Sequence, residues 1–399
     1  MEQRNIISAT AGNTGDKVRS DCYVSVEKKK TGGISIDIQS KVKSMYGRHM
    51  HDLTERVLVF FDIAHAEVKI IDTGALDFVI MARLEAAIKN ITGSNGSFLP
   101  EFIPENDYPT QRDAFRFSRL YVPGNSPALM LNAGIHKPNG VILDLEDSVA
   151  PNKKEEARIL VRNALLQVNF YGAERMVRIN PLPAGLEDLK AVIPHNVHVI
   201  LVPKAEKPDD LVLIDKVIRD ILKDAGSDRE VFLMPIIETA LGVENAYLLA
   251  TSTPSIVAMA IGLEDYTADI GVSRTAGGSE SLYARTRLVN ACKAAGIQPI
   301  DSVFSDVSDM EGLERNAKTS RALGFEGMGC IHPRQIRVIH KAFEPTPEEI
   351  EKAQKIVDSF TKASKQGLGV VSLGTKMIDL PVVKRAQRVV ALANQMGIL

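Results

Sequence analysis

Acidic residues follow two long apolar runs in the second half of this 399-residue chain. Glu238 ends the run VFLMPIIE, and Glu264 with Asp265 ends the run SIVAMAIGLED. Runs of this length are typical of strands buried on both faces, and parallel α/β folds place their chemistry at the carboxyl ends of such strands. Two carboxylates on neighbouring strands could bind one divalent cation. An acid in this position can equally cap a helix or pair with a lysine.

The segments around these acids form a regular series of strand-like and helix-like stretches. From Phe117 onward, eight apolar runs alternate with helix-like segments: FSRLYVP, GVILDLED, ERMVRIN, VHVILVPKAE, VFLMPIIET, SIVAMAIGLED, IQPIDSVFSDV and FEGMGCIHP. Eight strand–helix repeats within about 230 residues predict an α/β fold of the (β/α)8 TIM-barrel type.

Nearly every one of these strands ends in charged side chains. They are Asp144, Glu146, Asp147, Arg178, Lys204, Glu206, Glu238, Asp265, Asp301, Asp306 and His332. Charges that converge on one rim are costly unless they pair, bind a metal or face a ligand, so their recurrence predicts an active site. The expected metal ligands, Glu238 and Asp265, offer only oxygen, and no His/Cys cluster exists, which favours Mg²⁺ over Zn²⁺.

The first ninety residues have a different pattern. Two alternating stretches, CYVSVEK and GISIDIQS, predict half-buried strands, and AEVKIID predicts a third. Apolar positions at helical spacing between Val42 and Leu58, Met45 and Tyr46 among them, predict a helix, and LDFVIMARLEAAIKN predicts another. A small α+β domain is therefore expected, followed by a linker rich in Gly, Ser, Pro and Asn.

Composition excludes several classes of protein. The formal net charge is −2 with 25% charged residues, so neither nucleic acid nor an anionic membrane is an expected partner. No apolar segment reaches the roughly 18 residues of a membrane helix, and the N-terminus has no signal-peptide core. The three cysteines have no metal or disulfide spacing. We expect a cytoplasmic protein without disulfides.

The barrel region resembles a known enzyme family. The motifs that carry the resemblance are RLYVPGNSP, GVILDLEDSVAP, VRINP, PIIETALGV, GLEDYTADIG, LYARTRLVNACKAAGI, SDMEGL and GMGCIHPRQI. They are similar to the beta chain of citrate lyase and to the malyl-CoA and citramalyl-CoA lyases. The resemblance implies Mg²⁺-dependent cleavage of a 3-hydroxyacyl thioester into a keto acid and an acetyl-type thioester.

The resemblance also implies roles for individual residues. Glu238 and Asp265 match the metal ligands, and Arg178 matches the arginine that faces the thioester carbonyl. Asp144 and Glu146 are further catalytic candidates. The expected substrate-binding residues are Pro123, Gly124, Asn125, Lys204, Gly262, Leu263, Glu264 and Asp265.

The N-terminal region resembles the acyl carrier, or gamma, chain of bacterial citrate lyase. The similar stretches are Ala11–Gly12, IDIQSKVKSMYG and DTGALDFVIMARLEAAI. The resemblance implies a phosphoribosyl-dephospho-coenzyme A arm, attached to a serine through a phosphodiester. The family's Glu-Ser-x-Asp context is altered here. Ser20, followed by Asp21, is the preferred attachment site, and Thr14 is the second choice; the domain can also be vestigial.

The C-terminal segment contains the sequence GTKMID, which is similar to a lid of the acyl-CoA lyases. In those relatives the lid delivers an aspartate into a neighbouring subunit's site, which implies a homo-oligomer and gives Asp379 the role of general acid/base. The local alternative is that Asp379 caps the last helix, because Pro381 follows near its start.

These features divide the chain into an acyl-carrier-like domain (1–92), a linker (93–115), a TIM-barrel lyase domain (116–345) and a C-terminal helix with the lid segment (346–399). The leading interpretation is a fused carrier and lyase that cleaves citryl thioester, with a citrate lyase alpha-type transferase subunit as a candidate partner. A malyl-CoA or citramalyl-CoA lyase acting on free CoA thioesters is the first alternative. A non-catalytic carrier or assembly scaffold is the second.

Overall fold

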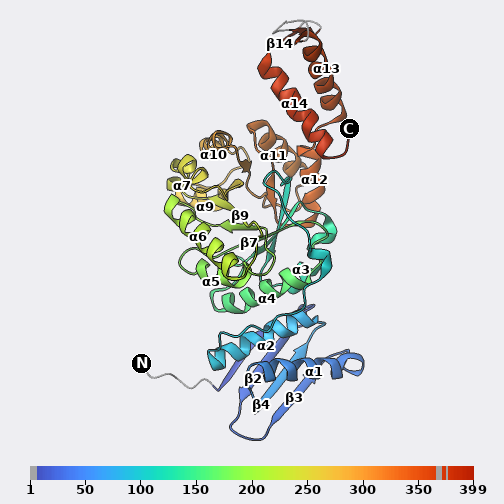
Figure 1. Ribbon diagram of the computed structural model, residues 1–399, viewed down its shortest axis with the longest axis vertical. Helices are drawn as coiled ribbons and strands as arrows, with labels where there is room; N and C mark the ends of the chain where they lie inside the picture. Colours follow the sequence, from blue (N-terminus) through green and yellow to red (C-terminus); the bar gives the residue numbers. More distant parts are fainter. Residues whose placement is uncertain (1–6, 365–370, 374–375) are drawn as a thin grey trace. The chain divides into compact units, whose positions relative to one another are not determined.

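The computed structural model describes residues 7–364, 371–373 and 376–399. The chain forms two compact units, residues 1–339 and residues 340–399 (Figure 1). The first unit holds the N-terminal α+β domain and the barrel, and the second holds the C-terminal helices. No helix in the described part of the chain is long and apolar enough to cross a membrane.

The N-terminal domain is a four-stranded sheet covered by two helices. The strands are β1 (Ser8–Gly12), β2 (Cys22–Lys28), β3 (Ile34–Gln39) and β4 (Ala66–Asp72), in the order β1-β2-β4-β3. The helices are α1 (Lys43–Phe60) and α2 (Asp77–Thr92). Burial alternates along β2 and β4, as the sequence predicts for half-buried strands. Sequence reasoning missed β1, because SATAG consists of small residues without an apolar alternation.

Helix α1 buries less of its surface than the sequence pattern indicates. Met50, Leu53 and Val57 are buried as expected. Met45 and Tyr46, which the helical spacing assigned to the same apolar face, are exposed. That part of the prediction is wrong.

The segment between the two domains is irregular except for the short 3-10 helix η1 (Pro104–Asn106). Its hydrogen bonds attach it to the barrel: the Asn106 amide donates to the carbonyls of Leu165 and Val168, and the Tyr108 hydroxyl donates to Ala173 O. The chain is therefore held along the barrel between its two domains.

Eight parallel strands form the barrel. They are β5 (Ser118–Pro123), β6 (Gly140–Asp144), β7 (Glu174–Arg178), β8 (Val199–Val202), β9 (Phe232–Ile237), β10 (Ala258–Ile261), β11 (Gln298–Ile300) and β12 (Met328–Cys330). The sheet runs from β11 through β10 down to β5 and then β12, and a bridge between Asp301 and Met328 connects its two edges. Each strand lies within one of the eight apolar runs, so the predicted barrel is confirmed.

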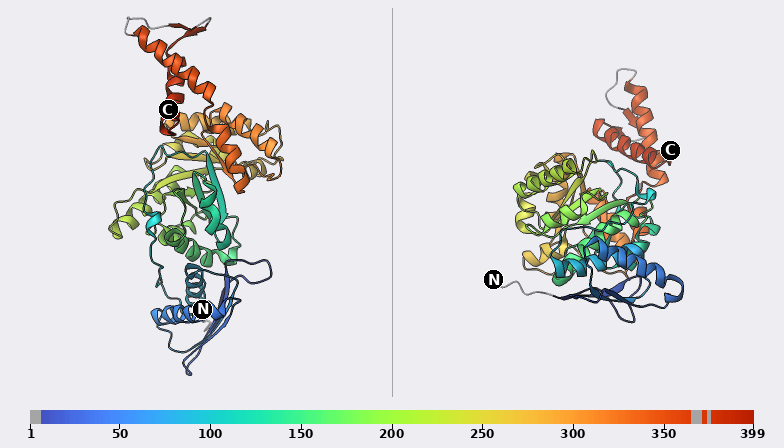
Figure 2. Two further views of the ribbon diagram at one scale, coloured as in Figure 1. Left: turned by 90° about the vertical axis from the view of Figure 1, so that its right-hand side faces the viewer. Right: turned by 60° about the horizontal axis from the view of Figure 1, so that its bottom comes forward.

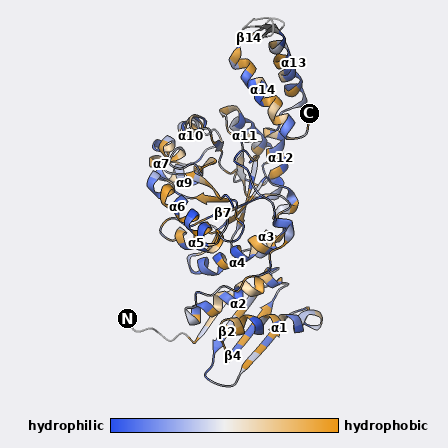
Figure 3. Ribbon diagram, viewed as in Figure 1, coloured by the Kyte–Doolittle hydropathy of each residue, from blue (hydrophilic) through white to orange (hydrophobic). Residues whose placement is uncertain are grey.

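Helices surround the strands (Figures 1 and 2). They are α3 (Pro127–Ala133), α4 (Lys154–Gln167), α5 (Gly185–Val192), α6 (Pro208–Asp224), α7 (Ala240–Glu244), α8 (Ala246–Ala250), α9 (Leu263–Asp269), α10 (Leu282–Ala295), α11 (Met310–Leu323) and α12 (Pro333–Phe343). Side chains from β6, β7, β8, β9 and β10 meet in one buried cluster, and hydropathy colouring shows apolar strands inside mixed helices (Figure 3). The barrel interior is a packed core that holds the strand ends in place.

The C-terminal unit contains α13 (Pro347–Ser364) and α14 (Leu380–Gln395) around a small apolar core. Thr346 and Glu349 exchange backbone-to-side-chain hydrogen bonds at the start of α13, which is a capping box. Two short strands, β13 (Val371–Leu373) and β14 (Lys376–Ile378), pair between the helices. Of the expected lid segment GTKMID, Gly374 and Thr375 lie outside the described residues.

Candidate active site

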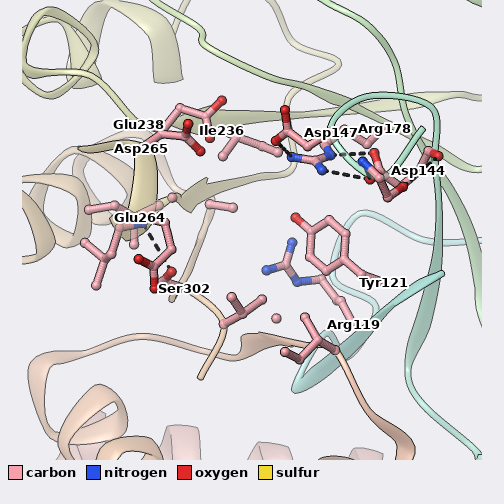
Figure 4. A pocket seen from close by; sticks show the side chains of 18 of the residues that line it. Arg119, Tyr121, Asp144, Asp147, Arg178, Ile236, Glu238, Glu264, Asp265 and Ser302 are labelled. Atoms are coloured by element: carbon pink, nitrogen blue, oxygen red, sulfur yellow. Dashed lines mark hydrogen bonds and ion pairs between the residues drawn. The ribbon is translucent and has the colours of Figure 1, made fainter. Parts of the chain in front are cut away.

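A cavity of about 450 Å³ opens at the carboxyl ends of the barrel strands. Its lining comes from residues that follow or end strands β5, β6, β7, β9, β10, β11 and β12 (Figure 4). Four of the six predicted catalytic and metal-ligating side chains line it: Asp144, Arg178, Glu238 and Asp265. Residues from different strands thus meet in one space, which is the usual position of chemistry in this fold.

Arg178, the last residue of β7, is held in place by acids. Its Nε and Nη2 donate to the two carboxylate oxygens of Asp144, at 2.7 and 2.8 Å. Its Nη1 lies 2.8 Å from Glu146 Oε2 and 3.2 Å from Asp147 Oδ2. Burial alone would raise the pKa of Asp144, but the hydrogen bonds from Arg178 lower it below its usual range. The guanidinium is therefore fixed in orientation and permanently charged.

Glu146 and Lys204 form the next layer around the cavity. Lys204 Nζ donates to Glu146 Oε1 at 2.8 Å. Burial and the nearby Asp147 raise the pKa of Glu146 despite its contacts with Arg178 and Lys204. Neither Glu146 nor Lys204 lines the cavity directly. The structure therefore places these two predicted site residues where they orient the groups that do line it.

Glu238 and Asp265 face each other across the ends of β9 and β10 (Figure 4). The backbone N–H of Lys204, a residue with φ of 49°, donates to Glu238 Oε1 at 2.7 Å. Burial and the negative charges of Glu146 and Asp265 raise the pKa of Glu238 to about 7. A carboxylate whose charge is disfavoured by a neighbouring carboxylate is suited to binding a cation that both can share.

The donor set fits Mg²⁺. A Cβ at position 262 would lie 2.6 Å from Glu238 Oε2, so only glycine leaves room for that carboxylate beside Asp265. Two carboxylates with open space beside them match the usual Mg²⁺ site, in which substrate and water supply the remaining ligands. The one cluster of three potential ligands among the described residues, His51, Asp52 and Glu55, lies on α1 and does not line the barrel cavity.

The segment Gly262 to Asp265 lies along the cavity as the first turn of α9. The N–H of Gly262 donates to Ile237 O, and that of Leu263 donates to the Ser302 hydroxyl. The N–H groups of Glu264 and Asp265 are in the first helical turn, where no carbonyl within the helix can accept from them. Glu264 itself is exposed and pairs with Arg274.

Of the predicted substrate-binding segment Pro123 to Asn125, one residue lines the cavity and two make contacts elsewhere. Pro123 lines the cavity, whereas Gly124 and Asn125 do not. Gly124 packs against the Asp144 carbonyl, where a Cβ would be 2.5 Å away. The Asn125 amide accepts from Arg83 Nη1 at 2.6 Å and donates to Glu156 at 3.0 Å. In this chain Asn125 therefore contacts the N-terminal domain.

The contact between the two domains is polar and buried. Gly12 N donates to Glu156 Oε2 at 2.9 Å, and Arg83 donates to both oxygens of Asp21 at 2.9 Å. Further along α2, Glu85 accepts two hydrogen bonds from Arg162 of α4, at 2.7 and 2.8 Å. Glu156 and Asn125 belong to segments that follow β6 and β5, so this contact lies beside the cavity rim.

The two candidate attachment residues flank the loop between β1 and β2. Thr14 is exposed. Ser20 is half-buried, has φ of 53°, and its N–H donates to Thr73 O. At one end of the loop, Gly12 bonds to Glu156 of the barrel. At the other end, Asp21 bonds to Arg83, whose guanidinium also donates to Asn125 of the barrel. The loop is therefore joined to the domain contact directly at Gly12 and through Arg83 at Asp21.

Asp379 lies at the start of α14 in the C-terminal unit. Its carboxylate accepts from the Val382 N–H at 3.2 Å, so it is the N-cap of that helix. The side chain is exposed. Capping leaves the second carboxylate oxygen available, so this geometry is compatible with a further role in proton transfer.

Sequence reasoning missed several residues that line the cavity. Arg119 and Tyr121 belong to β5, and Ser302 follows β11. Burial raises the pKa of Tyr121, and its ring lies 5.3 Å from the Arg178 guanidinium. One signal was available: Arg119 is the single charged residue inside the apolar run FSRLYVP.

A (β/α)8 barrel whose cavity combines a carboxylate pair with a fixed arginine has the characteristics of an aldolase-type carbon–carbon lyase. Residues 118–333 match the HpcH/HpaI aldolase/citrate lyase family, and the chain belongs to that family. Residues 8–91 match the ACP family, described as the malonate decarboxylase delta subunit. The chain is thus a carrier-like domain fused to a citrate lyase beta-like oxo-acid lyase.

Individual relatives agree with this assignment. The chain is 39% identical to citrate lyase subunit beta of Haemophilus influenzae over 285 residues, which cover 70% of this chain and 97% of that protein. It is 33% identical to human mitochondrial citramalyl-CoA lyase, with 69% and 84% covered. A Mycobacterium tuberculosis CitE structure with magnesium, acetoacetate and coenzyme A matches with a TM-score of 0.58 at 29% identity, covering 71% of this chain and all of that one.

Proposed function

We propose that this protein cleaves a citryl thioester into oxaloacetate and an acetyl thioester. The observation that supports this best is that one cavity contains both a carboxylate pair, Glu238 and Asp265, and a fixed guanidinium, Arg178. A 3-hydroxyacyl thioester has two ends that require different partners. Arg178 matches the thioester carbonyl, and the carboxylate pair, through a cation, matches the keto-acid end. A related Mycobacterium tuberculosis citrate lyase beta subunit has been solved with oxaloacetate and magnesium.

The reaction requires three changes at the substrate. The hydroxyl proton leaves, the carbon–carbon bond breaks to give a ketone, and its electron pair becomes the enolate of the acetyl thioester. Arg178 donates hydrogen bonds to the enolate oxygen, where negative charge develops. Asp144 and Glu146 keep the guanidinium aimed at that oxygen. We assign the acid/base role to Asp379, which would take up the hydroxyl proton and return it to the enolate carbon.

Glu238 and Asp265 would hold Mg²⁺, with Lys204 and Gly262 orienting Glu238. An ion held there would lower the pKa of the substrate hydroxyl. The N–H groups of Glu264 and Asp265, in the first turn of α9, would donate hydrogen bonds to the carboxylate of the keto-acid end.

We further propose that the N-terminal domain carries the acyl group on a phosphoribosyl-dephospho-coenzyme A arm, attached at Ser20 or, as the second choice, at Thr14. The contact of Gly12 with Glu156 supports this, together with the bonds of Arg83 to both Asp21 and Asn125, because these bonds join the loop between Gly12 and Asp21 to the barrel segments that follow β5 and β6. A tethered substrate would reach a high effective concentration there. A transferase subunit would load the arm, and delivery of Asp379 from another copy would require a homo-oligomer.

The second candidate is cleavage of free malyl-CoA or citramalyl-CoA. Its support is the human relative named citramalyl-CoA lyase, together with the altered sequence context of Ser20. The use of Asn125 in the domain contact favours the tethered substrate, because that residue is no longer available to a free ligand.

Intact-mass measurement and peptide mapping of protein from its native host, combined with a cleavage assay, test the proposal. An added nucleotide-type arm on Ser20 or Thr14 and Mg²⁺-dependent release of oxaloacetate are expected. An unmodified chain that cleaves free CoA thioesters would favour the second candidate. Absence of cleavage of any candidate thioester would leave a carrier or assembly scaffold.

A further inference from the structure

Arg119 is the deepest charged side chain of the cavity. Strand β5 points alternate residues inward, and Arg119, Tyr121 and Pro123 all line the cavity. Pro123 is at the carboxyl end of the strand and Arg119 is near its beginning, so the arginine lies one layer below Tyr121. Figure 4 shows its guanidinium beside the Tyr121 ring, apart from the Asp144–Arg178 pair.

The charge of Arg119 has no internal counterpart. Of the other buried arginines in the described chain, Arg83, Arg116, Arg162 and Arg285 each pair with a carboxylate. Arg175 bonds to two backbone carbonyls and stacks on Tyr108. Arg119 donates to the Met234 sulfur at 2.9 Å, forms no ion pair with any described residue, and its Nε has no partner.

A buried cation without a partner is costly, so its presence needs a reason. Arg119 is 1% exposed, and burial lowers its pKa. Arg119 and Arg178 are the two cations that line the cavity, and Arg178 is already surrounded by Asp144, Glu146 and Asp147. Arg119 is therefore the uncommitted positive charge available to an anionic group that enters the cavity.

We infer that Arg119 binds a second carboxylate of the substrate and thereby selects citryl-type thioesters. This inference rests on the proposed function. The thioester end and the keto-acid end account for Arg178 and for the Glu238–Asp265 pair. The remaining substituent on the hydroxyl-bearing carbon is a carboxymethyl group in a citryl thioester, a methyl group in a citramalyl thioester and a hydrogen in a malyl thioester.

Only the carboxymethyl group can pair with Arg119. A site built around a buried charge rejects a substrate that lacks the opposite charge, because the site's own group is then left unpaired. The methyl and hydrogen substituents would leave the guanidinium with the Met234 sulfur alone. Arg119 is thus a specificity-determining residue, and the expected product of the reaction is a keto acid with two carboxylates.

Two substitutions test this in the full-length protein. Arg119→Met removes the charge and retains an unbranched apolar side chain, and Arg119→Lys retains a cation of shorter reach. Calorimetric titrations with oxaloacetate and with pyruvate, at saturating Mg²⁺, measure the contribution of the second carboxylate. In Arg119→Met we expect oxaloacetate affinity to fall roughly 100-fold with pyruvate affinity unchanged, and Arg119→Lys should retain part of the preference.

The same variants provide a kinetic test. The ratio of kcat/KM for citryl against citramalyl thioester should fall by a comparable factor in Arg119→Met. Arg175→Met, which alters a buried arginine that lacks an ion pair but lies outside the cavity lining, should leave that ratio unchanged. The melting temperature of Arg119→Met should not fall, because the change removes an unpaired buried charge.

The outcomes separate the inference from the proposed function. If the wild type cleaves hydroxyacyl thioesters and Arg119→Met keeps the same preference in both measurements, the inference is overturned and the lyase function stands. A lower melting temperature with unchanged preference would assign Arg119 a purely structural role. If the wild type neither binds a keto acid nor cleaves any thioester, the proposed function fails and the inference fails with it.

Discussion

Two regions of this molecule contain buried charges, and they differ in whether those charges have partners. At the contact between the domains, Glu85 and Arg162 satisfy each other with two hydrogen bonds. In the barrel cavity, Glu238 has a raised pKa beside Asp265, and Arg119 has no carboxylate partner among the described residues. Charges that are satisfied within the chain fix its structure. Charges that are left unsatisfied in a cavity require a ligand, and they indicate where the chemistry occurs.

Removing one acid of the cavity pair should give the largest effect. In Asp265→Ala we expect Mg²⁺-dependent turnover to fall roughly 1000-fold or more, because the cation loses one of its two protein ligands. The melting temperature should remain the same or rise, since Glu238 loses a repulsive neighbour. Steady-state cleavage rates and a thermal melt check both parts. Retained activity would remove Asp265 as a ligand.

The fold was far easier to predict from sequence than the distribution of these charges. The eight barrel strands follow from apolar runs such as VFLMPIIET, because a strand buried on both faces leaves a continuous signal. The rim acids follow from their position after those runs. The partners of the charged and polar side chains do not follow from the sequence. Whether Asn125 faces a substrate or Arg83, for example, depends on how two separate domains pack, and local residue spacing does not encode that packing.

The missed residues have the same explanation. Arg83 and Glu85 interrupt the apolar helix LDFVIMARLEAAI, and Arg119 interrupts an apolar strand. Each interruption is visible in the sequence. Only the structure distinguishes Arg83, which has Asp21 as its partner, from Arg119, which has no carboxylate partner in the described part of the chain.

Asp379 has features of both kinds of charge. Its carboxylate accepts a hydrogen bond from its own helix, and it is also proposed to transfer a proton. Asparagine caps helices as well as aspartate does but cannot act as a general acid. Asp379→Asn should therefore lower turnover by about 10²- to 10⁴-fold without a loss of stability. Cleavage rates and thermal melts of the variant, with Mg²⁺ binding measured in parallel, decide the matter. Unchanged turnover would return Asp379 to a capping role alone.

Breaking one pair at the domain contact should act on stability. Glu85→Gln leaves the buried Arg162 guanidinium without its carboxylate, which should cost about 3–5 kcal/mol of unfolding free energy. Urea denaturation measures this cost. Asp220→Asn, which alters the exposed pair with Lys216, is the matched control and should cause no measurable change. If both variants have the same stability, the interface charges do not hold the domains as argued.

His198 is a buried group whose neutral form the fold requires, so it makes the stability of the protein depend on pH. Its Nδ1 accepts from the Arg175 N–H at 3.1 Å, and its Nε2 lies 2.9 Å from Tyr108 O, an arrangement that only the neutral ring satisfies. Burial and the charge of Arg175 lower the pKa of His198 to about 3. The unfolded chain takes up this proton below about pH 6.5, and the folded chain does so only near 3.

The stability that depends on the neutral His198 ring is thus complete above pH 6.5 and decreases as the pH falls toward 3. His198→Gln, whose amide cannot take up a proton, should reduce the slope of unfolding free energy against pH between 6.5 and 4.5, even where it lowers stability at neutral pH. Urea denaturation across this range measures the slope, and His51→Gln on the exposed face of α1 is the control. An unchanged slope in His198→Gln would mean that other groups cause the loss of stability in acid, and that the contact of His198 with Arg175 and Tyr108 is not what keeps the ring neutral.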